Sequence, residues 1–244
     1  MILEVCCGSA EDVLLAAGAG ADRVELNSAL FLGGLTPSIG AMEVARQVSI
    51  PIMAMVRPRE GGFCYSEAEF AAMLADARAL LAAGADGIVF GCLHPDGRVD
   101  KARCAAMLEV IGKKESVFSR AIDVVPDWRE ALDVLMELGV TRVLTSGQAS
   151  SAPAGADTIR AMREYAAGRI QILPGCGVRP DNAAALLAAT GCDQLHGSFK
   201  TSRTDLSATH NPAVSFSGGV CPPEEQVPVT DAAAVRAALW ALGK

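Results

Sequence analysis

A regular alternation of short apolar runs with helical segments is the feature that most constrains the fold of this 244-residue chain. Apolar runs of this length predict strands buried on both faces, as in parallel sheets. They lie at about residues 2–7, 24–27, 51–57, 87–92, 117–123, 142–147, 170–177 and 193–198. Helical stretches follow the first seven runs, and no Pro/Ser-rich linker divides the chain. This pattern predicts an α/β fold, a single (β/α)8 TIM barrel over residues 1–244, better than a doubly wound sheet.

The best-defined helix is predicted between Ser66 and Gly84. Apolar residues recur there at i, i+3, i+4, i+7, i+10 and i+11, from Phe70 to Leu81. Serine is a favourable N-cap, and glycine commonly ends a helix. A stripe of this kind predicts a helix that packs one face against the sheet.

Residues 200–230 interrupt the alternation before a final helix expected at 231–242. The segment contains Gly218-Gly219 and Pro222-Pro223 and has little apolar periodicity. A loop of this length in a compact domain is usually functional or lies between subunits. We therefore predict a lid or an oligomer arm, with disorder as the alternative.

Composition narrows the range of partners. Hydrophobic residues make up 51% of the chain, and no apolar run approaches the roughly 18 residues that span a membrane. The net charge of -7 argues against general nucleic-acid binding, because phosphate affinity requires a basic face. Residues 1–7 show no basic segment leading into an apolar signal sequence. We expect a cytoplasmic protein without nucleic-acid or membrane partners, whose eight cysteines, lacking any C-x-x-C pair, are mostly reduced and buried.

The predicted strand at 51–57 ends in two arginines, Arg57 and Arg59, on either side of Pro58. TIM barrels carry their sites at the C-terminal ends of the strands, so we expect these guanidinium groups to bind a small anionic ligand there. Glycine turns after the sixth and seventh strands would let backbone N–H groups approach the same ligand. The alternative is that the arginines only pair with carboxylates of neighbouring loops. The predicted anion-binding residues are Arg57, Arg59, Arg120, Ser146, Gly147, Gly175 and Gly177.

Side-chain alternation places polar residues inside the predicted barrel. If Leu3 and Val5 face the helices, Glu4 and Cys6 must face inward. The same reasoning turns further polar residues inward on the second, seventh and eighth strands, namely Arg23, Glu25, Asn27, Gln171, Gln194 and His196. Because an unpaired buried charge costs several kcal/mol, we expect Arg23 to bridge Glu4 and Glu25.

Some of these residues are candidates for proton transfer. Glu25 lies near the C-terminal mouth, and Asp123 follows the fifth strand. Together with His196 they form the predicted catalytic set. A purely structural polar core is the alternative for the deeper residues Glu4 and Arg23.

With these residues identified, the chain resembles the CutC family of copper-homeostasis proteins over nearly its whole length. The matching segments are Asp22-Arg23-Val24-Glu25-Leu26, Gly33-Gly34-Leu35-Thr36-Pro37-Ser38, residues 52–65 around Arg57-Pro58-Arg59, Asp96-Gly97 with Asp100, Arg120-Ala121 with Asp123, and Leu144-Thr145-Ser146-Gly147. The resemblance implies a TIM barrel, a cytoplasmic location, assembly into a homo-oligomer and a link to copper handling.

Two positions depart from the family pattern. Many relatives have a cysteine where this chain has Asn27, at the end of the second strand and facing Cys6. A pair of thiolates suits Cu(I), a soft ion, so the resemblance leaves Cys6 as the metal-ligand candidate, alone or aided by Cys64 or Cys92. The other departure is Ser119, where the family has a histidine that could act as a general acid or base near neutral pH.

Two hypotheses about function follow. The first is a CutC-like protein of copper homeostasis that binds copper(I) and carries an arginine-lined anion pocket. The second is a TIM-barrel lyase, isomerase or hydrolase that acts on a small phosphorylated or carboxylated metabolite. In that enzyme Arg57, Arg59 and Arg120 would hold the anion while Glu25 or Asp123 transfers a proton.

Overall fold

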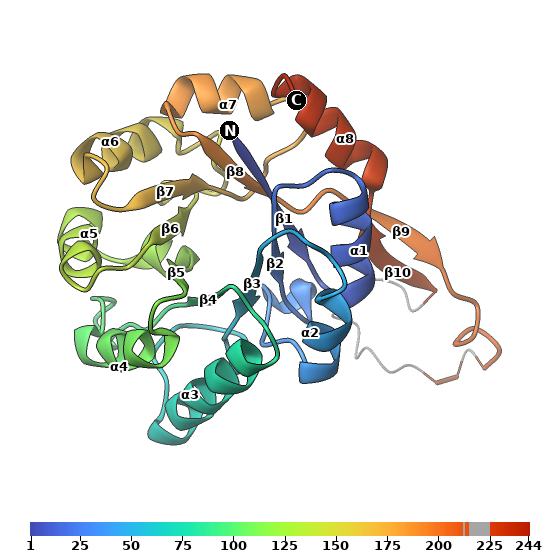
Figure 1. The fold of residues 1–244 in the computed structure, drawn as a ribbon, viewed down its shortest axis with the longest axis horizontal. Helices are drawn as coiled ribbons and strands as arrows, with labels where there is room; N and C mark the ends of the chain where they lie inside the picture. Colours follow the sequence, from blue (N-terminus) through green and yellow to red (C-terminus); the bar gives the residue numbers. More distant parts are fainter. Residues whose placement is uncertain (212, 215–224) are drawn as a thin grey trace.

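The computed structural model describes residues 1–211, 213–214 and 225–244, and its centre is a barrel of eight parallel strands (Figure 1). The strands are β1 (Ile2–Cys7), β2 (Arg23–Leu26), β3 (Ile52–Met55), β4 (Gly87–Phe90), β5 (Glu115–Phe118), β6 (Arg142–Thr145), β7 (Gln171–Pro174) and β8 (Gln194–Gly197). Their order around the sheet is β7-β6-β5-β4-β3-β2-β1-β8. The predicted (β/α)8 TIM barrel is therefore confirmed.

The helices surround the strands on the outside of the barrel (Figure 1). They are α1 (Ala10–Gly18), α2 (Ile39–Ala45), α3 (Glu67–Ala82), α4 (Lys101–Ile111), α5 (Trp128–Glu137), α6 (Ala156–Ala166), α7 (Ala183–Thr190) and α8 (Ala232–Ala241). Two 3-10 helices, η1 (Leu30–Leu32) and η2 (Arg120–Val124), follow β2 and β5. Within the described ranges, none of the helices has both the length and the apolar composition needed to cross a membrane.

α3 shows how local sequence defines these elements. The Ser66 side chain accepts a hydrogen bond from the Glu69 backbone N–H (3.2 Å), and the Glu69 carboxylate accepts one from the Ser66 N–H (2.7 Å). This capping box satisfies two backbone donors that the first helical turn leaves unpaired. The buried face of the helix consists of Phe70, Met73, Ala77 and Leu80, as the stripe predicted.

The fifth strand is shorter than predicted. β5 ends at Phe118, and the chain turns into η2 at Ser119, whose side chain accepts a hydrogen bond from the Ala121 N–H (3.4 Å). A serine at this position competes with strand pairing by bonding its own backbone. Arg120 and Asp123 therefore lie on a helical turn beyond the strand end and not on the strand.

The long connection between β8 and α8 is present, but its described ends are strands. β9 (Lys200–Thr204) and β10 (Gln226–Thr230) pair antiparallel and extend away from the barrel next to α1 (Figure 1). No apolar alternation marked β9, because four of its five side chains are exposed. The Asp12 carboxylate on α1 accepts hydrogen bonds from Lys200 Nζ (2.6 Å) and from the Thr230 N–H. Gly218-Gly219 and Pro222-Pro223, which suggested a lid, lie outside the described residues.

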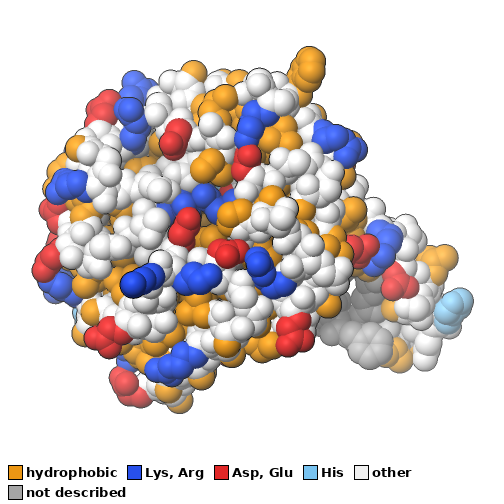
Figure 2. All heavy atoms as spheres, viewed as in Figure 1, with side chains coloured by type: hydrophobic (Ala, Val, Ile, Leu, Met, Phe, Trp, Pro, Cys, Tyr) orange, Lys and Arg blue, Asp and Glu red, His pale blue; other side chains and the backbone are white. Residues whose placement is uncertain are grey.

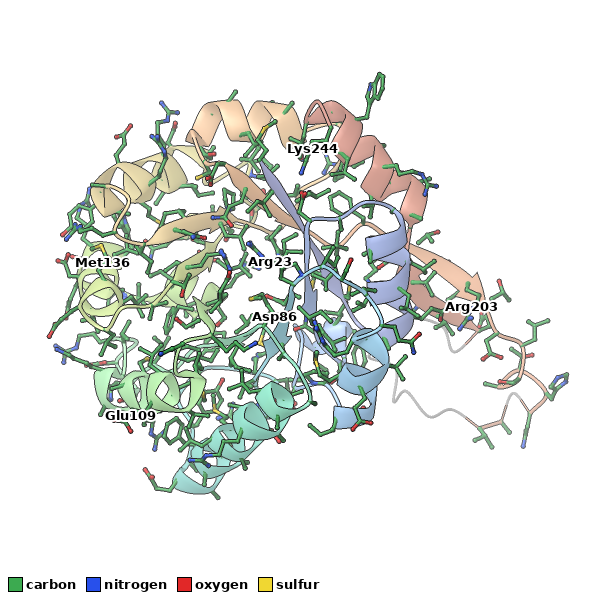
Figure 3. The ribbon with its side chains drawn as sticks, in the orientation of Figure 1. Arg23, Asp86, Glu109, Met136, Arg203 and Lys244 are labelled. Atoms are coloured by element: carbon green, nitrogen blue, oxygen red, sulfur yellow. The ribbon has the colours of Figure 1, made fainter. Side chains whose placement is uncertain are left out.

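The barrel interior has two chemically different sides, which we call the apolar half and the polar half. The apolar half is a buried cluster from β3 to β7: Met53, Met55, Val89, Val117, Leu144 and Leu173. The polar half comes from β1, β2 and β8: Glu4, Cys6, Arg23, Glu25, Asn27, Gln194 and His196. Figure 3 shows Arg23 near the middle of the barrel, whereas Arg203 extends from the hairpin. A second apolar core fills the space between the strands and the helices.

The outer surface mixes charges of both signs. On the face seen in Figure 2, Lys and Arg side chains alternate with Asp and Glu side chains around the end of the barrel. A nucleic-acid-binding face would instead gather basic side chains into one patch. This face therefore offers no uniform electrostatic attraction to a phosphate backbone.

Candidate metal centre

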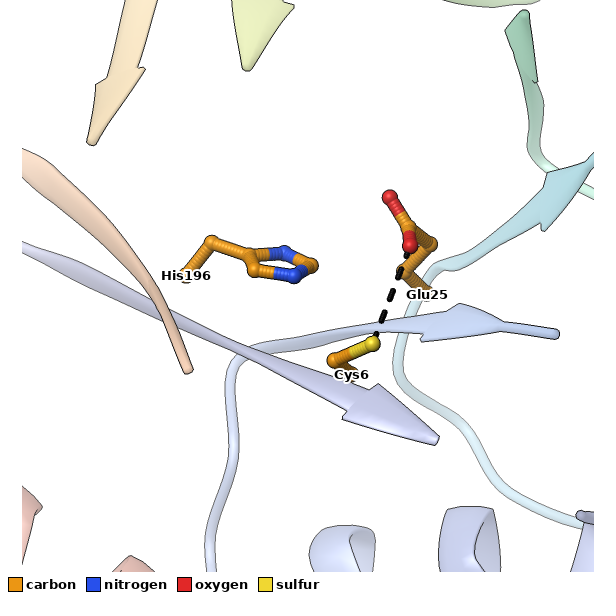
Figure 4. A group of neighbouring side chains, drawn as sticks. All are labelled: Cys6, Glu25 and His196. Atoms are coloured by element: carbon orange, nitrogen blue, oxygen red, sulfur yellow. Dashed lines mark hydrogen bonds between the residues drawn. The ribbon is translucent and has the colours of Figure 1, made fainter. Parts of the chain in front are cut away.

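Three side chains of metal-ligating types converge inside the polar half (Figure 4). Cys6 on β1, Glu25 on β2 and His196 on β8 each offer one ligand atom, and these atoms all lie within 4.8 Å of one another. The Cys6 Sγ lies 3.9 Å from Glu25 Oε1. Glu25 and His196 are buried, and Cys6 is partly buried. The cluster therefore combines a thiol, a carboxylate and an imidazole in one protected place.

Strand register brings these residues together. Cys6 pairs with Glu25 between β1 and β2, and Glu4 pairs with His196 between β1 and β8. The His196 ring also needs space beside β7, where a Cβ added at Gly175 would lie 3.2 Å from His196 Cδ2. The absence of a side chain at Gly175 thus leaves room for the imidazole. The anion-binding role of Gly175 stays a prediction.

Glu4 orients the histidine. The Glu4 Oε1 lies 2.7 Å from His196 Nδ1, so the other ring nitrogen, Nε2, is left for the cluster. The second oxygen of Glu4 pairs with Arg23 Nε, and Arg23 Nη2 donates to Gln194 Oε1 (2.8 Å). A carboxylate behind a histidine is a common support for a metal-binding imidazole, because it fixes the ring orientation and tautomer.

The prediction that Arg23 bridges Glu4 and Glu25 is confirmed for Glu4 and wrong for Glu25. Arg23 pairs in register with Glu4, and its Nη2 donates to Gln194 on β8, the strand on the other side of β1. Glu25 lies two residues farther along β2, beside Cys6, and bonds Asn27. Glu25 is therefore available to the cluster and is not neutralised by the arginine.

The surroundings shift the pKa values of the two buried carboxyl groups, Glu4 and Glu25, in opposite directions. Burial alone would raise the pKa of Glu4. The Arg23 charge and the His196 hydrogen bond outweigh burial and lower the pKa to about 2. Burial raises the pKa of Glu25. For His196, burial lowers the pKa, but the Glu25 carboxylate and contacts with Cys6 and Glu4 raise it well above its ordinary value. Burial also raises the pKa of the Cys6 thiol. A cation that binds the cluster therefore competes with protons for these groups.

One buried oxygen of the cluster has no partner. Glu25 Oε2 is buried without a hydrogen bond within the described chain, whereas Oε1 accepts one from Asn27 Nδ2 (2.9 Å). The same amide nitrogen lies 3.6 Å from Cys6 Sγ. A buried carboxylate oxygen normally has a partner, so the unpaired Oε2 marks a place for a cation or a donor. Asn27 supplies an amide at the position where the family resemblance puts a cysteine in many relatives, and the donor set of this chain still fits a metal ion.

The structure places Arg57 and Arg59 in one loop but gives them separate partners. Arg57 is buried and donates to the carbonyl oxygens of Leu32 (3.0 Å), Gly34 (3.1 Å) and Gly61 (2.7 Å). Arg59 is partly exposed and pairs with Glu69 (2.5 Å). Arg57 thus ties the loop after β2 to the loop after β3, and each guanidinium already has acceptors.

Arg120, Asp123 and Ser146 are brought together at the ends of β5 and β6. Arg120 donates to Asp123 Oδ2 (2.8 Å) and to Ser146 Oγ (2.9 Å). The Asp123 carboxylate also accepts from Ser146 Oγ (2.8 Å), from the Ser146 N–H (3.0 Å), from Thr145 Oγ1 (2.6 Å) and from the Gln148 N–H (3.2 Å). Donors of the kind we expected to bind a free anion therefore bind this internal carboxylate.

Gly147 and Gly177 have a backbone role in their loops. Their φ angles are 71° and 74°, in the left-handed region that favours glycine. The Gly147 N–H donates to Thr145 Oγ1 (2.9 Å), and the Gly177 carbonyl accepts from Asn182 Nδ2 (2.9 Å). These contacts account for the two glycines without a ligand, so their predicted part in anion binding remains a hypothesis.

One buried interior residue was missed. Arg142, the first residue of β6, is buried and donates to Gln171 Oε1 (2.9 Å) and Glu115 Oε2 (2.8 Å). The alternation in Arg142-Val143-Leu144 would have identified it, since Leu144 faces the interior and Arg142 lies two residues earlier. The polar layer at the N-terminal end of the barrel is therefore larger than predicted.

The fold and the cluster define a class, a TIM barrel with ionisable and thiol side chains where apolar residues usually fill the interior. Comparison with known proteins gives the family. The sequence profile of the CutC family matches residues 1–201, so the chain belongs to the CutC family.

Individual relatives agree. A CutC family protein of Treponema denticola is 49% identical over 228 residues, which cover 93% of both chains. The human copper homeostasis protein cutC homolog is 40% identical over 236 residues, covering 96% of this chain and 86% of the human one. A crystal structure of CutC from Streptococcus agalactiae superposes with a TM-score of 0.78 at 32% identity, covering 81% of this chain and 98% of that one.

Proposed function

We propose that this CutC-family protein takes part in copper homeostasis by binding a copper ion at Cys6, Glu25 and His196. The observation that carries the proposal is the convergence of three ligand atoms within 4.8 Å inside the barrel. Thiolate and imidazole are good ligands for copper. The copper-related name of the human homologue supports the choice of metal.

In this proposal each side chain has a defined part. Cys6 supplies a thiolate sulfur, His196 its Nε2, and Glu25 the oxygen that lacks a partner in the protein. Glu4 and Arg23 hold the imidazole in place from behind. Cysteines within the described residues are free thiols, which supports a reducing, cytoplasmic setting in which copper is present as Cu(I).

The proposal is tested by titrating the reduced protein with Cu(I) in competition with a chromogenic Cu(I) chelator. We expect binding of one equivalent, lost in Cys6→Ser and in His196→Ala. Cys64→Ser, which removes an exposed thiol outside the cluster, is the matched control and should bind like the parent protein. Equal Cu(I) affinity of the parent and both cluster variants would show that copper binds elsewhere or not at all.

A second candidate function is acid–base catalysis on a small anionic metabolite. The observation that favours it is the position of two buried carboxyl groups beside one imidazole, since Glu4 lies 2.7 Å from His196 Nδ1 and Glu25 lies within 4.8 Å of the His196 ligand atom. Their surroundings lower the pKa of Glu4 and raise that of Glu25, and such pairs often divide acid and base roles. Glu25 or His196 would transfer the proton, while Arg59 and Arg120, both partly exposed, would hold the anion. Asp123 would orient Arg120.

Ligand-induced thermal shifts test this second function. Inorganic phosphate and small carboxylic acids should raise the unfolding temperature of the parent protein, and Arg120→Ala should abolish the rise. Arg129→Ala, on the surface of α5, is the control. If no anion stabilises the parent protein, or if Arg120→Ala responds like the parent, the anion site is excluded.

A further inference from the structure

The barrel has a weak seam between β7 and β8. Every other pair of neighbouring strands is joined by a ladder of residue pairs. Within the described chain, β7 and β8 are joined only by an isolated bridge between Gly175, the residue after β7, and His196. At the opposite end of this seam the connection passes through side chains, as Gln194 Nε2 donates to Gln171 Oε1 (3.3 Å). The strand edges therefore separate towards the N-terminal end of the barrel.

A cavity of about 500 Å³ lies at this separated end, opposite the mouth that carries the candidate metal centre. Its walls come from the end of α6, the start of β7 and the segment that leads into β8. The lining includes Arg163, Glu164, Ile170, Gln171, Cys192 and Asp193. The volume is in the range of small-molecule sites.

The cavity holds charges of both signs that do not neutralise one another. Arg163, Glu164 and Asp193 line the same space, yet none of the ion pairs within the described residues involves them. The Arg163 guanidinium lies over Gly191, where an added Cβ would be 3.2 Å from Nη1. All three side chains are exposed and are not engaged with one another, so both charges are open to a ligand that carries an ammonium and a carboxylate group.

Two further groups extend this complementarity. The Gln171 Oε1 accepts hydrogen bonds from Arg142 Nε (2.9 Å) and Gln194 Nε2 (3.3 Å), which leaves its exposed amide N–H groups as donors. α6 and α7 both end at this cavity, and a helix C-terminus carries partial negative charge. Donors for an anion and a negative field for a cation therefore meet in one place.

We propose that this cavity binds a small zwitterion of the amino-acid class. The carboxylate lies at Arg163 and the Gln171 amide, and the ammonium group lies at Asp193 and Glu164. The ligand side chain contacts Ile170 and Ile172, which also line the cavity. The inference is independent of copper binding, because the cavity shares no residue with the Cys6, Glu25 and His196 cluster.

Isothermal titration of the metal-free full chain with L-alanine, L-leucine, L-lysine and L-glutamate tests the proposal. We expect saturable binding of at least one amino acid, about tenfold or more tighter than acetate or methylammonium, which carry only one of the two charges. Arg163→Ala and Asp193→Asn should each weaken binding by about tenfold or more. Arg160→Ala, on the same helix but outside the cavity, should bind like the parent protein.

Amide NMR locates the binding and checks folding in the same sample. Bound amino acid should move the resonances of Gly168 and Gly191, which line the cavity, and leave those of Gly33 and Gly34 at the mouth unchanged. A well-dispersed spectrum shows that each variant is folded. Absence of saturable binding by all four amino acids, or equal binding by both cavity variants, overturns the proposal. Cys6→Ser should retain amino-acid binding whatever its effect on copper.

Discussion

The two halves of the barrel interior solve the same packing problem with different chemistry. The apolar half fills its space with methionine, valine and leucine side chains, which need no partners. The polar half, on β1, β2 and β8, holds charged and amide side chains, and most of their polar atoms are hydrogen-bonded. Burial of charge costs stability unless it is paired, so we expect the apolar half to contribute more to the stability of the fold than the polar half, which carries the proposed copper site.

The largest expected effect comes from breaking the polar half at Glu4. Glu4→Ala leaves the buried Arg23 charge and the His196 ring without their shared acceptor. We expect a loss of about 3–5 kcal/mol in the free energy of unfolding, measured by urea denaturation. A loss below about 1 kcal/mol, the level of an exposed ion pair, would mean that water replaces the carboxylate and that the polar half is not closed.

A slightly smaller effect is expected from the apolar half. Leu173→Ala leaves a cavity among fully buried neighbours and should cost about 2–4 kcal/mol. Cu(I) affinity should be unchanged, because Leu173 belongs to the apolar half, which includes none of the three proposed copper ligands. The control Leu173→Met keeps the volume and should cost less than about 1.5 kcal/mol. A parallel loss of copper affinity in Leu173→Ala would show that the two halves are not independent.

A third variant tests the support of His196 by Glu4 and leaves the three proposed copper ligands in place. Glu4→Gln keeps the size of the side chain but removes the charge that supports His196, so Cu(I) affinity should fall by about tenfold or more. Glu115→Gln is the matched control, since this carboxylate also pairs with an interior arginine, Arg142, but does not touch His196. Competition with the chromogenic Cu(I) chelator measures the Cu(I) affinity of both variants. Equal affinities in the two variants would remove the supporting role of Glu4.

The smallest effect concerns a charge outside the barrel. Burial raises the pKa of Asp12, but its bonds with Lys200 and with backbone N–H groups lower it below the ordinary value. A lowered folded-state pKa contributes stability that is present above the unfolded value of about 3.9 and is lost as pH falls through the folded value. Asp12→Asn should therefore flatten the acid limb of stability against pH, recorded by circular dichroism. An unchanged acid limb would show that other carboxylates cause the loss of stability at low pH.

The interior of this site could be predicted from the sequence because strand alternation is local. Glu4, Cys6, Glu25 and His196 were all assigned inward-facing positions from the apolar residues beside them. Their contacts depend on which strands become neighbours. The Glu4–His196 contact joins the first and the last strand of the barrel, so it exists only once the ring closes.

The C-terminal mouth of the barrel was harder to predict, because the contacts of loop residues do not follow from any periodicity in the sequence. The position of Arg57 at a strand end indicated a site, but its three carbonyl acceptors come from two loops whose course no periodicity defines. Asp123 was assigned a proton-transfer role, which stays a prediction, and nothing in the sequence indicated the hydrogen bonds that it accepts from the end of β6 and the loop that follows. β9 escaped prediction because four of its five side chains are exposed, so it carries no apolar alternation. β10 escaped prediction because it is short and contains Pro228, a residue that argues against a strand.

The single bridge between β7 and β8 has a consequence for how the molecule opens. A closed ring of ladders has to break two rows of backbone hydrogen bonds to release a strand, but here one boundary is already nearly free. Local unfolding begins where the fewest backbone bonds must break, so excursions of the native state should start at this boundary. Solvent deuterium would then enter the facing edges of these two strands well before it reaches β3 and β4.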